Sequence, residues 1–526
     1  MKISDTLKPL IYASLIVLGI VIGGILTPGG NSNFLVKNAK KEKLARLIDY
    51  IDNEYVDDVN TDSIVDLTVN SILAKLDPHS VYIPQKEMAQ TAENMKGDFV
   101  GIGVNFYLYK DSLAIINPVP GSPSEKVGIK AGDRILYADE IPIFGKNVTT
   151  DTLVSLLKGV VNSSVKLKIF RRGSKNLLDF TIQRDHIPIK SVDAGYMLTD
   201  KIGYIKINRF AESTYDEFLE ALEKLLKQKM EALVLDLRSN PGGYVTIAEK
   251  IADEFLPNKA TIVTTKNKSG KITKSIATSG GRFENKPIYV LIDENSASAS
   301  EIVAGALQDN DAATIVGRRS FGKGLVQREM ALGDGSAVRL TIARYYTPTG
   351  RSIQRPYDHG VDDYYDDFYN RYDNGEMQNL DSIKVEKELK YTTPKGKVVY
   401  GGGGIVPDVF IPLDTIHGSE ALRFLDMSGN FNFFMFEQLD QNRAKYQSLK
   451  LADFKNREII TDSIANEFID YYADRGLKLK FNTFKDKLKT YLAANLAGQL
   501  FGSEAKSELL NQEDTLIKKV IELNRK

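Results

Sequence analysis

The sequence predicts an α/β fold: a crossover-type core with a mainly parallel central sheet, an inserted β-rich domain, a helical N-terminal segment and a helical C-terminal extension. Helical and strand patterns alternate between residues 203 and 335, which is typical of crossover units around a parallel sheet. Short β-rich runs, punctuated by Gly and Pro, fill residues 95–186. The chain of 526 residues is also longer than a single hydrophobic core can serve.

The composition excludes several classes of protein. Apolar residues make up 42% and charged residues 26% of the chain, so neither a disordered chain nor a multi-span membrane protein fits. Lys and Arg together (69) balance Asp and Glu (69), and without a basic surplus we expect no nucleic-acid partner. Cysteine is absent, which excludes disulfides, thiolate catalysis and cysteine-ligated metals. We expect no cofactor and no metal.

Residues 1–30 predict a membrane anchor that is not cleaved. Residues 9–26 carry no charge and are just long enough to cross the hydrocarbon core of a bilayer. Lys2 and Lys8 precede this run, so the positive-inside tendency directs the rest of the chain outward, although basic residues also follow the run. We therefore expect a single-pass protein of the cell envelope, with its bulk outside the cytoplasm on the periplasmic side.

Four segments follow the anchor. Residues 31–94 are a helical segment, 95–186 the β-rich domain, 187–413 the core and 414–526 the helical extension. Within the core the patterns predict strands at 203–207, 232–237, 288–292 and 312–316, and helices at 215–227, 247–255 and 300–308. An insertion covers about 357–397. Its Tyr- and Asp-rich part, 357–376, lacks the spacing of a calcium loop and is expected to be a solvated surface segment.

Three loops follow strands of the predicted sheet and should meet at its carboxyl edge. The first has the sequence RSNPGG at 238–243, whose glycines let backbone N–H groups approach an oxygen. The second carries SASASE at 296–301, and the third carries SFGKGLVQ at 320–327. A hydroxyl, an amine and a glycine-rich turn would then converge.

Ser298, in the second loop, has two interpretations. With Glu301 it forms the pattern of a capping box, which would start the next helix. The small residues around it also leave room for a substrate carbonyl, and the helix that follows would direct its positive end at an oxyanion. A cap and a nucleophile are compatible roles for neighbouring serines.

Lys323, in the third loop, is the candidate base. None of the four histidines lies in the three loops. A lysine acts as a base near neutral pH only if its pKa falls from about 10.4 toward about 7 or 8. Burial under Phe321, Leu325 and Val326 would lower it, and the side-chain carbonyl of Gln327 could hold the amine. The alternative is an exposed or anion-binding lysine.

With these residues in place, the chain resembles the C-terminal processing peptidases, or tail-specific proteases. The resemblance spans about residues 44–412 and includes LDPHS at 76–80, DLRSNPGG at 236–243, YTPTG at 346–350 and GIVPD at 404–408, besides the serine and lysine loops. It implies that Ser298 is the nucleophile, Lys323 the general base and Gln327 the support of the lysine. The insertion and the helical extension depart from the family pattern.

The resemblance has two further implications. It places an oxyanion hole at the N–H of Ala299 and at that of either Gly243 or Gly242. The segment at about 97–183 resembles a PDZ domain, which captures an extended peptide at a sheet edge and binds its terminal carboxylate with backbone N–H groups. The carboxylate-binding turn would be the GIGV sequence, formed by Gly101, Ile102, Gly103 and Val104.

These features lead to one functional hypothesis. We expect a serine endopeptidase that cleaves protein substrates with accessible C-termini, using a PDZ-like domain to capture the tail and a Ser-Lys dyad to form and hydrolyse an acyl-enzyme. A non-catalytic PDZ adaptor or chaperone of the cell envelope is the alternative from another class. An acyl-CoA enzyme would leave the PDZ-like segment unexplained. Assembly into a homo-oligomer is left open.

Overall fold

The structure is a computed structural model that describes residues 39–145, 149–414, 418–446, 448–456, 459–476 and 481–525. The chain separates into two compact units, Met1–Ile72 and Leu73–Lys526. The predicted anchor at residues 9–26 lies outside the described residues. Within the ranges given above, no helix is both long enough and apolar enough to cross a membrane.

The predicted N-terminal helices are present. The first unit contains α2 (Ala39–Glu54) and all but the last residue of α3 (Thr61–Leu73). The second unit continues with β1 (Val81–Ile83) and α4 (Gln85–Lys96). Helix α4 ends at Gly97, whose left-handed backbone terminates the helix without the steric cost that a side chain would add.

The β-rich domain is built on an antiparallel sheet with the strand order β3-β4-β5-β7-β8, and β6 pairs with β5. In β7 every second residue is buried, as the alternating sequence SVKLKIF predicts. Strands β2 and β9, the first and last of the domain in sequence, form a separate antiparallel pair. The elements are β2 (Asp98–Gly101), β3 (Val104–Tyr109), β4 (Ser112–Pro118), α5 (Pro123–Lys126), β5 (Arg134–Ala138), β6 (Ile141–Pro142), α6 (Thr150–Leu157), β7 (Ser164–Phe170), β8 (Leu178–Gln183) and β9 (Asp185–Pro188).

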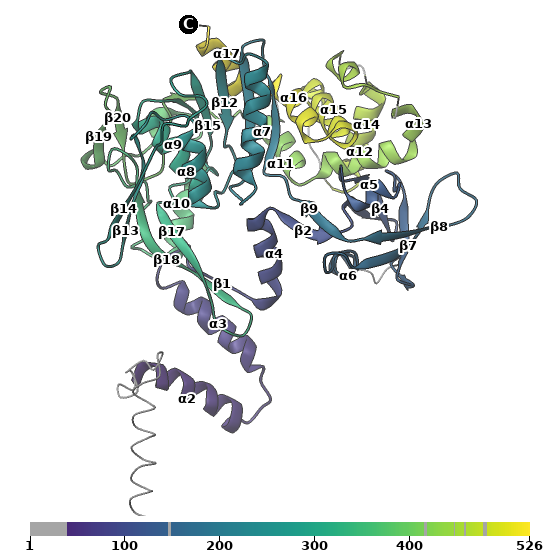
Figure 1. Ribbon diagram of the computed structural model, residues 1–526, viewed down its shortest axis with the longest axis horizontal. Coiled ribbons are helices and arrows are strands. Elements are labelled where there is room, and N and C mark those ends of the chain that lie inside the picture. The colour runs from purple at the N-terminus through teal and green to yellow at the C-terminus, as the bar shows by residue number, and fades with distance from the viewer. Residues whose placement is uncertain are drawn as a thin grey trace, which may run out of the picture. The chain divides into compact units, whose positions relative to one another are not determined.

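The central sheet of the core has the strand order β10-β11-β12-β15-β16-β21. Two of its middle strands, β12 and β15, are labelled in Figure 1. Strands β11 to β21 pair in parallel along this order, whereas β10 joins the edge antiparallel. Every residue of β12 and β15 is buried, which explains their unbroken apolar runs. The strands are β10 (Val192–Met197), β11 (Ile202–Ile207), β12 (Ala232–Asp236), β15 (Ile288–Ile292), β16 (Thr314–Gly317) and β21 (Val409–Phe410).

Helices cover both faces of this sheet. On one face, α7 (Thr214–Lys227), α8 (Val245–Asp253) and α9 (Ala299–Asp309) share a hydrophobic core with alternate residues of the strands. On the other face lies α17 (Thr515–Leu523), which buries Leu516, Ile517 and Val520 against Val234 and Leu291. Helix α17 is therefore packed directly on the central sheet.

A second sheet, with the order β1-β18-β13-β14 and with β17 paired to β18, is antiparallel throughout. The insertion forms helix α10 (Val361–Asp373) and the hairpin β19 (Lys390–Thr392) and β20 (Val398–Tyr400). The remaining strands are β13 (Thr261–Asn267), β14 (Ile272–Ile276), β17 (Leu325–Ala331) and β18 (Ala337–Tyr346).

The C-terminal extension is helical, as predicted, and has a hydrophobic core of its own. Aromatic side chains dominate this core; Phe431 stacks on Phe468 with ring centroids 4.9 Å apart. The helices are α11 (Ser419–Met427), α12 (Asn430–Gln441), α13 (Arg443–Tyr446), α14 (Asp462–Ala473), α15 (Lys485–Phe501) and α16 (Ser503–Asn511).

The coarse α/β class is thus confirmed, but the prediction of mainly parallel pairing describes only the central sheet. Among the strands that the structure describes, the pairings in all other sheets are antiparallel.

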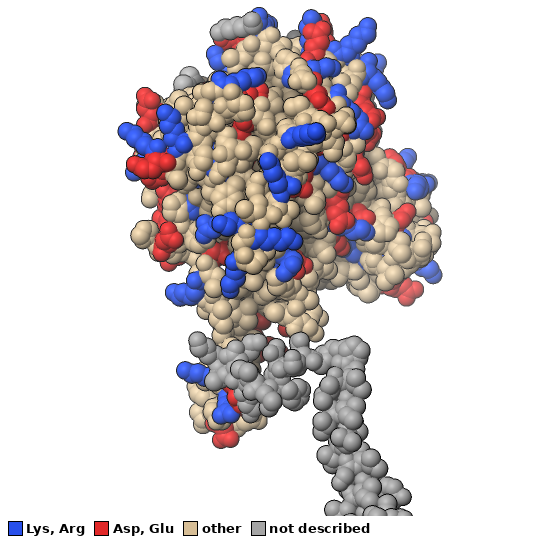
Figure 2. All heavy atoms as spheres, turned by 60° about the vertical axis from the view of Figure 1, so that its left-hand side comes forward, with Lys and Arg blue, Asp and Glu red and all other residues tan. Residues whose placement is uncertain are grey.

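On the face shown in Figure 2, basic and acidic side chains are interspersed.

Candidate active site

The three predicted loops meet at the carboxyl ends of β12, β15 and β16. The Ala297 N–H donates to the carbonyl of Asn240 at 3.0 Å, and the Phe321 N–H donates to the carbonyl of Ser296 at 3.0 Å. The Ser300 hydroxyl donates to the same Asn240 carbonyl at 2.9 Å. The loops are therefore hydrogen-bonded to one another as the crossover connections predict.

Ser298 lies at the N-cap of α9 in a strained backbone conformation. Its φ is 55° and its ψ is −111°, a region that non-glycine residues rarely adopt and that is common at functional sites. Gly242, with φ +101°, comes so close that a Cβ built there would lie 2.8 Å from both Ala297 O and Ser298 Cβ. Glycine at 242 is therefore what allows the RSNPGG backbone to approach the serine.

Glu301 connects the serine loop to the lysine loop. Its buried carboxylate accepts the N–H of Ser298 at 2.8 Å, which forms the Glu301 half of the predicted capping box. The same carboxylate accepts the N–H of Lys323 at 2.9 Å, the N–H of Gly322 at 2.7 Å and the hydroxyl of Ser320 at 2.5 Å. Burial raises the pKa of Glu301, and these hydrogen bonds oppose the rise.

Lys323 is partly buried and is held by Gln327. Its Nζ donates to Gln327 Oε1 at 2.9 Å, as predicted. Burial, reinforced by the positive charge of Arg339, lowers the pKa of Lys323 to about 8, while Glu301 and Asp77 act in the opposite direction. The value lies in the range that a lysine base requires near neutral pH.

The hydroxyl of Ser298 and the amine of Lys323 are not hydrogen-bonded to each other in the part of the chain that the structure describes. Tyr345 nevertheless ties their backbones together, because its hydroxyl lies 3.2 Å from Ser298 O and 2.9 Å from Lys323 O. In proteins without a bound substrate, catalytic hydrogen bonds are often long and tighten only in the complex.

The backbone N–H groups beside Ser298 differ in their availability. The N–H of Gly242 is already donated to the side-chain oxygen of Asn240 at 2.9 Å. By contrast, within the described ranges the N–H groups of Gly243 and Ala299 have no hydrogen-bond acceptor. A Cβ built at Gly242 would lie 2.9 Å from the Ala299 nitrogen, so the two loops that carry these donors are adjacent.

The predicted carboxylate-binding turn lies in the β-rich domain, between β2 and β3. Ile102 is buried there, and Gly103 adopts φ +77° with no room for a side chain, since a Cβ would lie 2.3 Å from Ser122 Cβ. Among the described strands, β3 pairs only with β4, so its other edge is unpaired. The turn leads into the sheet of the β-rich domain, whereas the three loops follow strands of the central sheet.

His79 lies outside the three loops in the sequence, but the fold brings it next to Gln327, the partner of the lysine. Its backbone carbonyl accepts a hydrogen bond from Gln327 Nε2. Its ring Nε2 lies 3.0 Å from the hydroxyl of Tyr364. Burial, reinforced by the charge of Lys323, lowers the pKa of His79 to about 3, so the ring is neutral near pH 7. The LDPHS motif, which contains His79, was the sequence signal that could have indicated this contact with Gln327.

The insertion is only in part the solvated surface segment that was predicted: its Asp side chains are exposed, but one face of its helix is buried. Helix α10 buries Tyr364, Phe368 and Arg371, whose spacing of four and three residues is that of one helical face and could have revealed the contact. The Arg371 guanidinium donates to the carbonyl of Ser320 at 2.8 Å and to that of Phe321 at 3.3 Å. The insertion therefore packs on the lysine loop.

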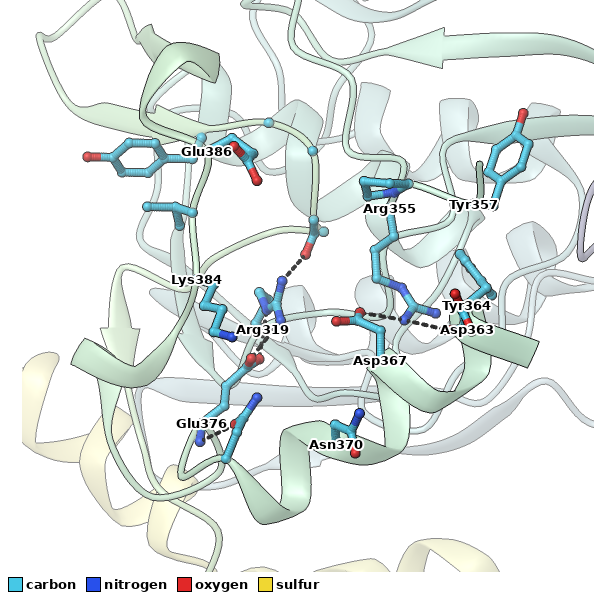
Figure 3. Close-up of a pocket in the computed structure, with 18 of the residues that line it drawn as sticks. Arg319, Arg355, Tyr357, Asp363, Tyr364, Asp367, Asn370, Glu376, Lys384 and Glu386 are labelled. Atoms are coloured by element: carbon cyan, nitrogen blue, oxygen red, sulfur yellow. Dashed lines mark hydrogen bonds and ion pairs between the residues drawn. The ribbon is translucent and has the colours of Figure 1, made fainter. Parts of the chain in front are cut away.

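A cavity of about 620 Å³ separates α10 from the glycine-rich segment 401–404 (Figure 3). Arg355 pairs with Asp367 at 3.1 Å, and Arg319 pairs with Glu376 at 2.6 Å. Neither catalytic candidate lines this cavity. The described residues contain no group of three or more His, Asp or Glu side chains that could hold a metal ion.

Comparison with known proteins identifies the parts of the chain. The model of peptidase family S41 matches residues 201–364, a PDZ domain model matches residues 100–182, and a family of unknown function matches residues 421–502. A solved structure of the photosystem II D1 C-terminal processing protease is 25% identical, with a TM-score of 0.36, and covers 70% of this chain and 86% of that one.

Curated relatives are more similar. The carboxy-terminal-processing protease of Bartonella bacilliformis is 38% identical over 321 residues, which are 60% of this chain and 73% of that protein. The carboxy-terminal processing proteases CtpB and CtpA of Bacillus subtilis are 34% and 33% identical over 60% and 62% of this chain, and over 65% and 70% of their own lengths. The chain therefore belongs to the carboxy-terminal processing proteases of peptidase family S41, serine peptidases that carry a PDZ domain.

Proposed function

We propose that the chain is a membrane-anchored endopeptidase that cleaves protein substrates near their C-termini through a Ser-Lys dyad. Ser298 Oγ attacks the peptide carbonyl, and Lys323 accepts the hydroxyl proton and then returns it to the leaving amine. Water hydrolyses the resulting acyl-enzyme. Gln327 orients the lysine.

The state of the Lys323 amine carries this proposal. The residue is partly buried, the pKa of its amine is lowered to about 8, and Gln327 Oε1 holds the amine at 2.9 Å. A lysine that only binds anions has to be charged. Loss of solvation disfavours the charged form and so would not serve that role. The partial desolvation of the amine, which lowers its pKa, is what lets Lys323 act as a base.

The approach of Ser298 to Lys323 completes the dyad when a substrate binds. Both loops are held by the Glu301 carboxylate and by the Tyr345 hydroxyl, which contacts both backbones. The movement that forms the hydrogen bond can therefore be confined to the two side chains, with their backbones fixed.

The oxyanion forms between two backbone donors. We assign the N–H groups of Ala299 and Gly243 to it, since the N–H of Gly242 is already donated to Asn240. Donors aimed at the developing negative charge supply much of the stabilisation in acyl transfer, and the loss of one donor costs about 10²–10³-fold in kcat.

The PDZ-like domain captures the substrate tail. The unpaired edge of β3 can accept an extended peptide, and we assign the binding of its terminal carboxylate to the turn from Gly101 to Val104, which joins β2 to β3. Binding of the free tail then selects the substrate without a deep pocket for one side chain.

The cell envelope is the proposed location. The uncharged run at residues 9–26, preceded by Lys2 and Lys8, supports a single anchor with the catalytic part outside the cytoplasm. Residues 9–26 lie outside the described part of the chain.

One experiment tests the proposal. Full-length wild type, Ser298→Ala and Lys323→Ala proteins are incubated with an envelope protein extract, and new termini are sequenced by mass spectrometry. We expect new C-termini with the wild type alone, and circular dichroism spectra that are alike for all three proteins. Normal turnover by Lys323→Ala would overturn the assignment of the base. Tails that bind but stay intact, with no labelling of the wild type by a serine-directed acylating probe, would favour the adaptor.

A further inference from the structure

The C-terminal extension, most of which matches a family of unknown function, contacts two parts of the second unit that the proposed function links. At one end it packs on the PDZ-like domain, and at the other end it reaches the RSNPGG loop. Between these ends α12 and α15 share one hydrophobic core. The extension therefore has the internal packing that a rigid connecting element needs.

The first end is an aromatic contact with strand β3. Phe433 and Phe436 of α12 lie against Tyr107, with ring centroids 5.2 Å from the Tyr107 ring in both cases. Phe436 is fully buried, and beside it Arg134 pairs with Asp440 at 2.6 Å. The extension holds the PDZ-like domain by side chains of β3, while the unpaired backbone edge of β3 is where the tail is proposed to bind.

The second end is an ion pair on the core. Asp514, the N-cap of α17, accepts the N–H groups of Leu516 at 2.8 Å and Ile517 at 3.3 Å through its Oδ1. Its other oxygen, Oδ2, accepts from Arg238 Nη1 at 2.6 Å. The aspartate thus starts the last helix and fixes an arginine of the core with separate atoms.

Arg238 is the first residue of the RSNPGG loop, and its guanidinium is shared between two carboxylates. Besides Asp514 it binds Asp236, with Nη2 at 2.6 Å and Nε at 2.9 Å from the Asp236 oxygens. Two residues further on, the carbonyl of Asn240 accepts the N–H of Ala297 in the serine loop. The position of Arg238 therefore affects the position of the loop that carries Gly243.

We propose that the C-terminal extension is a brace between the PDZ-like domain and the RSNPGG loop, and that Asp514 is the positioning residue through which it holds Arg238 and that loop. Arg238 is only 18% exposed at its side chain, as is Asp514, so water screens their interaction weakly. Without Asp514, the guanidinium loses one of its two charged partners and the loop loses an anchor outside the core. The proposal rests on the proposed function, since it assigns the oxyanion donor to this loop.

Asp514→Asn tests the brace, because asparagine caps helices as well as aspartate but lacks the charge. We expect kcat on a substrate with a free C-terminal tail to fall about ten- to a hundredfold, as for small misplacements of reacting groups, with KM within about twofold of wild type. Asp514→Glu, which restores the charge, should recover part of kcat. The matched control is Asp426→Asn, whose carboxylate accepts from Lys506 and Asn495 inside the extension and should leave kcat unchanged.

The outcomes separate the brace from general destabilisation and from the proposed function. Unchanged kcat in Asp514→Asn would overturn the role of Asp514, and so would an equal loss in Asp426→Asn or a loss that follows only a lower unfolding temperature. If the wild type itself does not cleave, or if Ser298→Ala cleaves as well as wild type, the proposed function fails instead.

Asp440→Asn tests the other end of the brace. It removes the partner of Arg134, so we expect KM for a substrate with a free C-terminal tail to rise several-fold while kcat stays at the wild-type value. The reason is that this end holds the tail-capturing domain and not the reacting loop. An unchanged KM, or a loss in kcat equal to that of Asp514→Asn, would refute this part of the proposal.

Discussion

The pKa of Lys323 predicts how the activity depends on pH. The lysine acts as a base only when it is neutral, so kcat/KM should rise with pH and reach half of its plateau at about pH 8. At pH 7 about 9% of the amine is neutral with this pKa, roughly 300-fold more than for an unshifted lysine. The lowering of the pKa from 10.5 to about 8 corresponds to about 3 kcal/mol against the charged form.

Arg339→Gln tests the direction in which the inflection of the pH profile should move. The Arg339 charge helps to lower the pKa of Lys323, so its removal should move the inflection above pH 8 and reduce activity at pH 7. Arg339 also pairs with Glu329 at 3.2 Å, and the uncompensated carboxylate would raise the pKa further. Because the pair is partly exposed, the difference between variant and wild type should shrink in high salt.

The assay is the cleavage rate of a tail-bearing substrate between pH 6 and 10, with the unfolding temperature measured at each pH. The folded pKa of Lys323 is lower than its unfolded value, so between about pH 8 and 10.5 the unfolded state binds more protons and this lysine makes the fold more stable as pH rises. A loss of activity there would not come from Lys323. A flat profile from pH 7 to 9, an inflection near 6.5, or a downward shift in Arg339→Gln would refute the assignment.

Three substitutions at the site give further predictions. Lys323→Met should abolish cleavage but raise the free energy of unfolding by up to about 3 kcal/mol at pH 7, because it removes an amine whose charged form is disfavoured by partial burial; a less stable variant in a denaturant titration would contradict this. Gly242→Ala should cost at least about 2 kcal/mol and most of kcat, since its Cβ would meet Ala297 O and Ser298 Cβ at a positive φ; normal kcat with an unchanged unfolding midpoint would count against the close approach. Glu301→Gln should destabilise the fold by about 1–3 kcal/mol, because the amide cannot accept all four hydrogen bonds. It should also move the inflection of the pH profile below 8, because the Glu301 charge raises the pKa of Lys323. An inflection that stays in place would argue against this electrostatic effect.

The sequence was sufficient for features that neighbouring residues determine. The continuous apolar runs of β12 and β15 indicated buried strands, and the three loops after the strands of the parallel sheet were expected at one edge. The hydrogen bond from Lys323 to Gln327 was one outcome that the sequence allowed and that the family resemblance implied. The choice between Gly242 and Gly243 could not be made from the sequence, because it depends on which N–H the side chain of Asn240 accepts.

Features that depend on distant partners were not predictable from local patterns. The contact of His79 with Gln327 joins residues far apart in the chain. Nothing in the sequence of α17 indicated that its apolar face would cover the central sheet. The acidic composition of α10 indicated solvent, yet Arg371 reaches back to the lysine loop. A local pattern can show which face of a helix is apolar, but it does not identify the partner that this face contacts.

Glu301 shows how a helix cap becomes part of a catalytic site. The capping-box pattern needs only a carboxylate three residues after the cap, and the Ser298 N–H satisfies one of its oxygens. The same carboxylate also accepts the N–H groups of Gly322 and Lys323. A fully buried carboxylate is stable only when its oxygens are satisfied, so the lysine loop has to close on it. The local rule that starts the helix therefore also brings the proposed base to the proposed nucleophile, which is why capping and catalysis are not alternatives at this position.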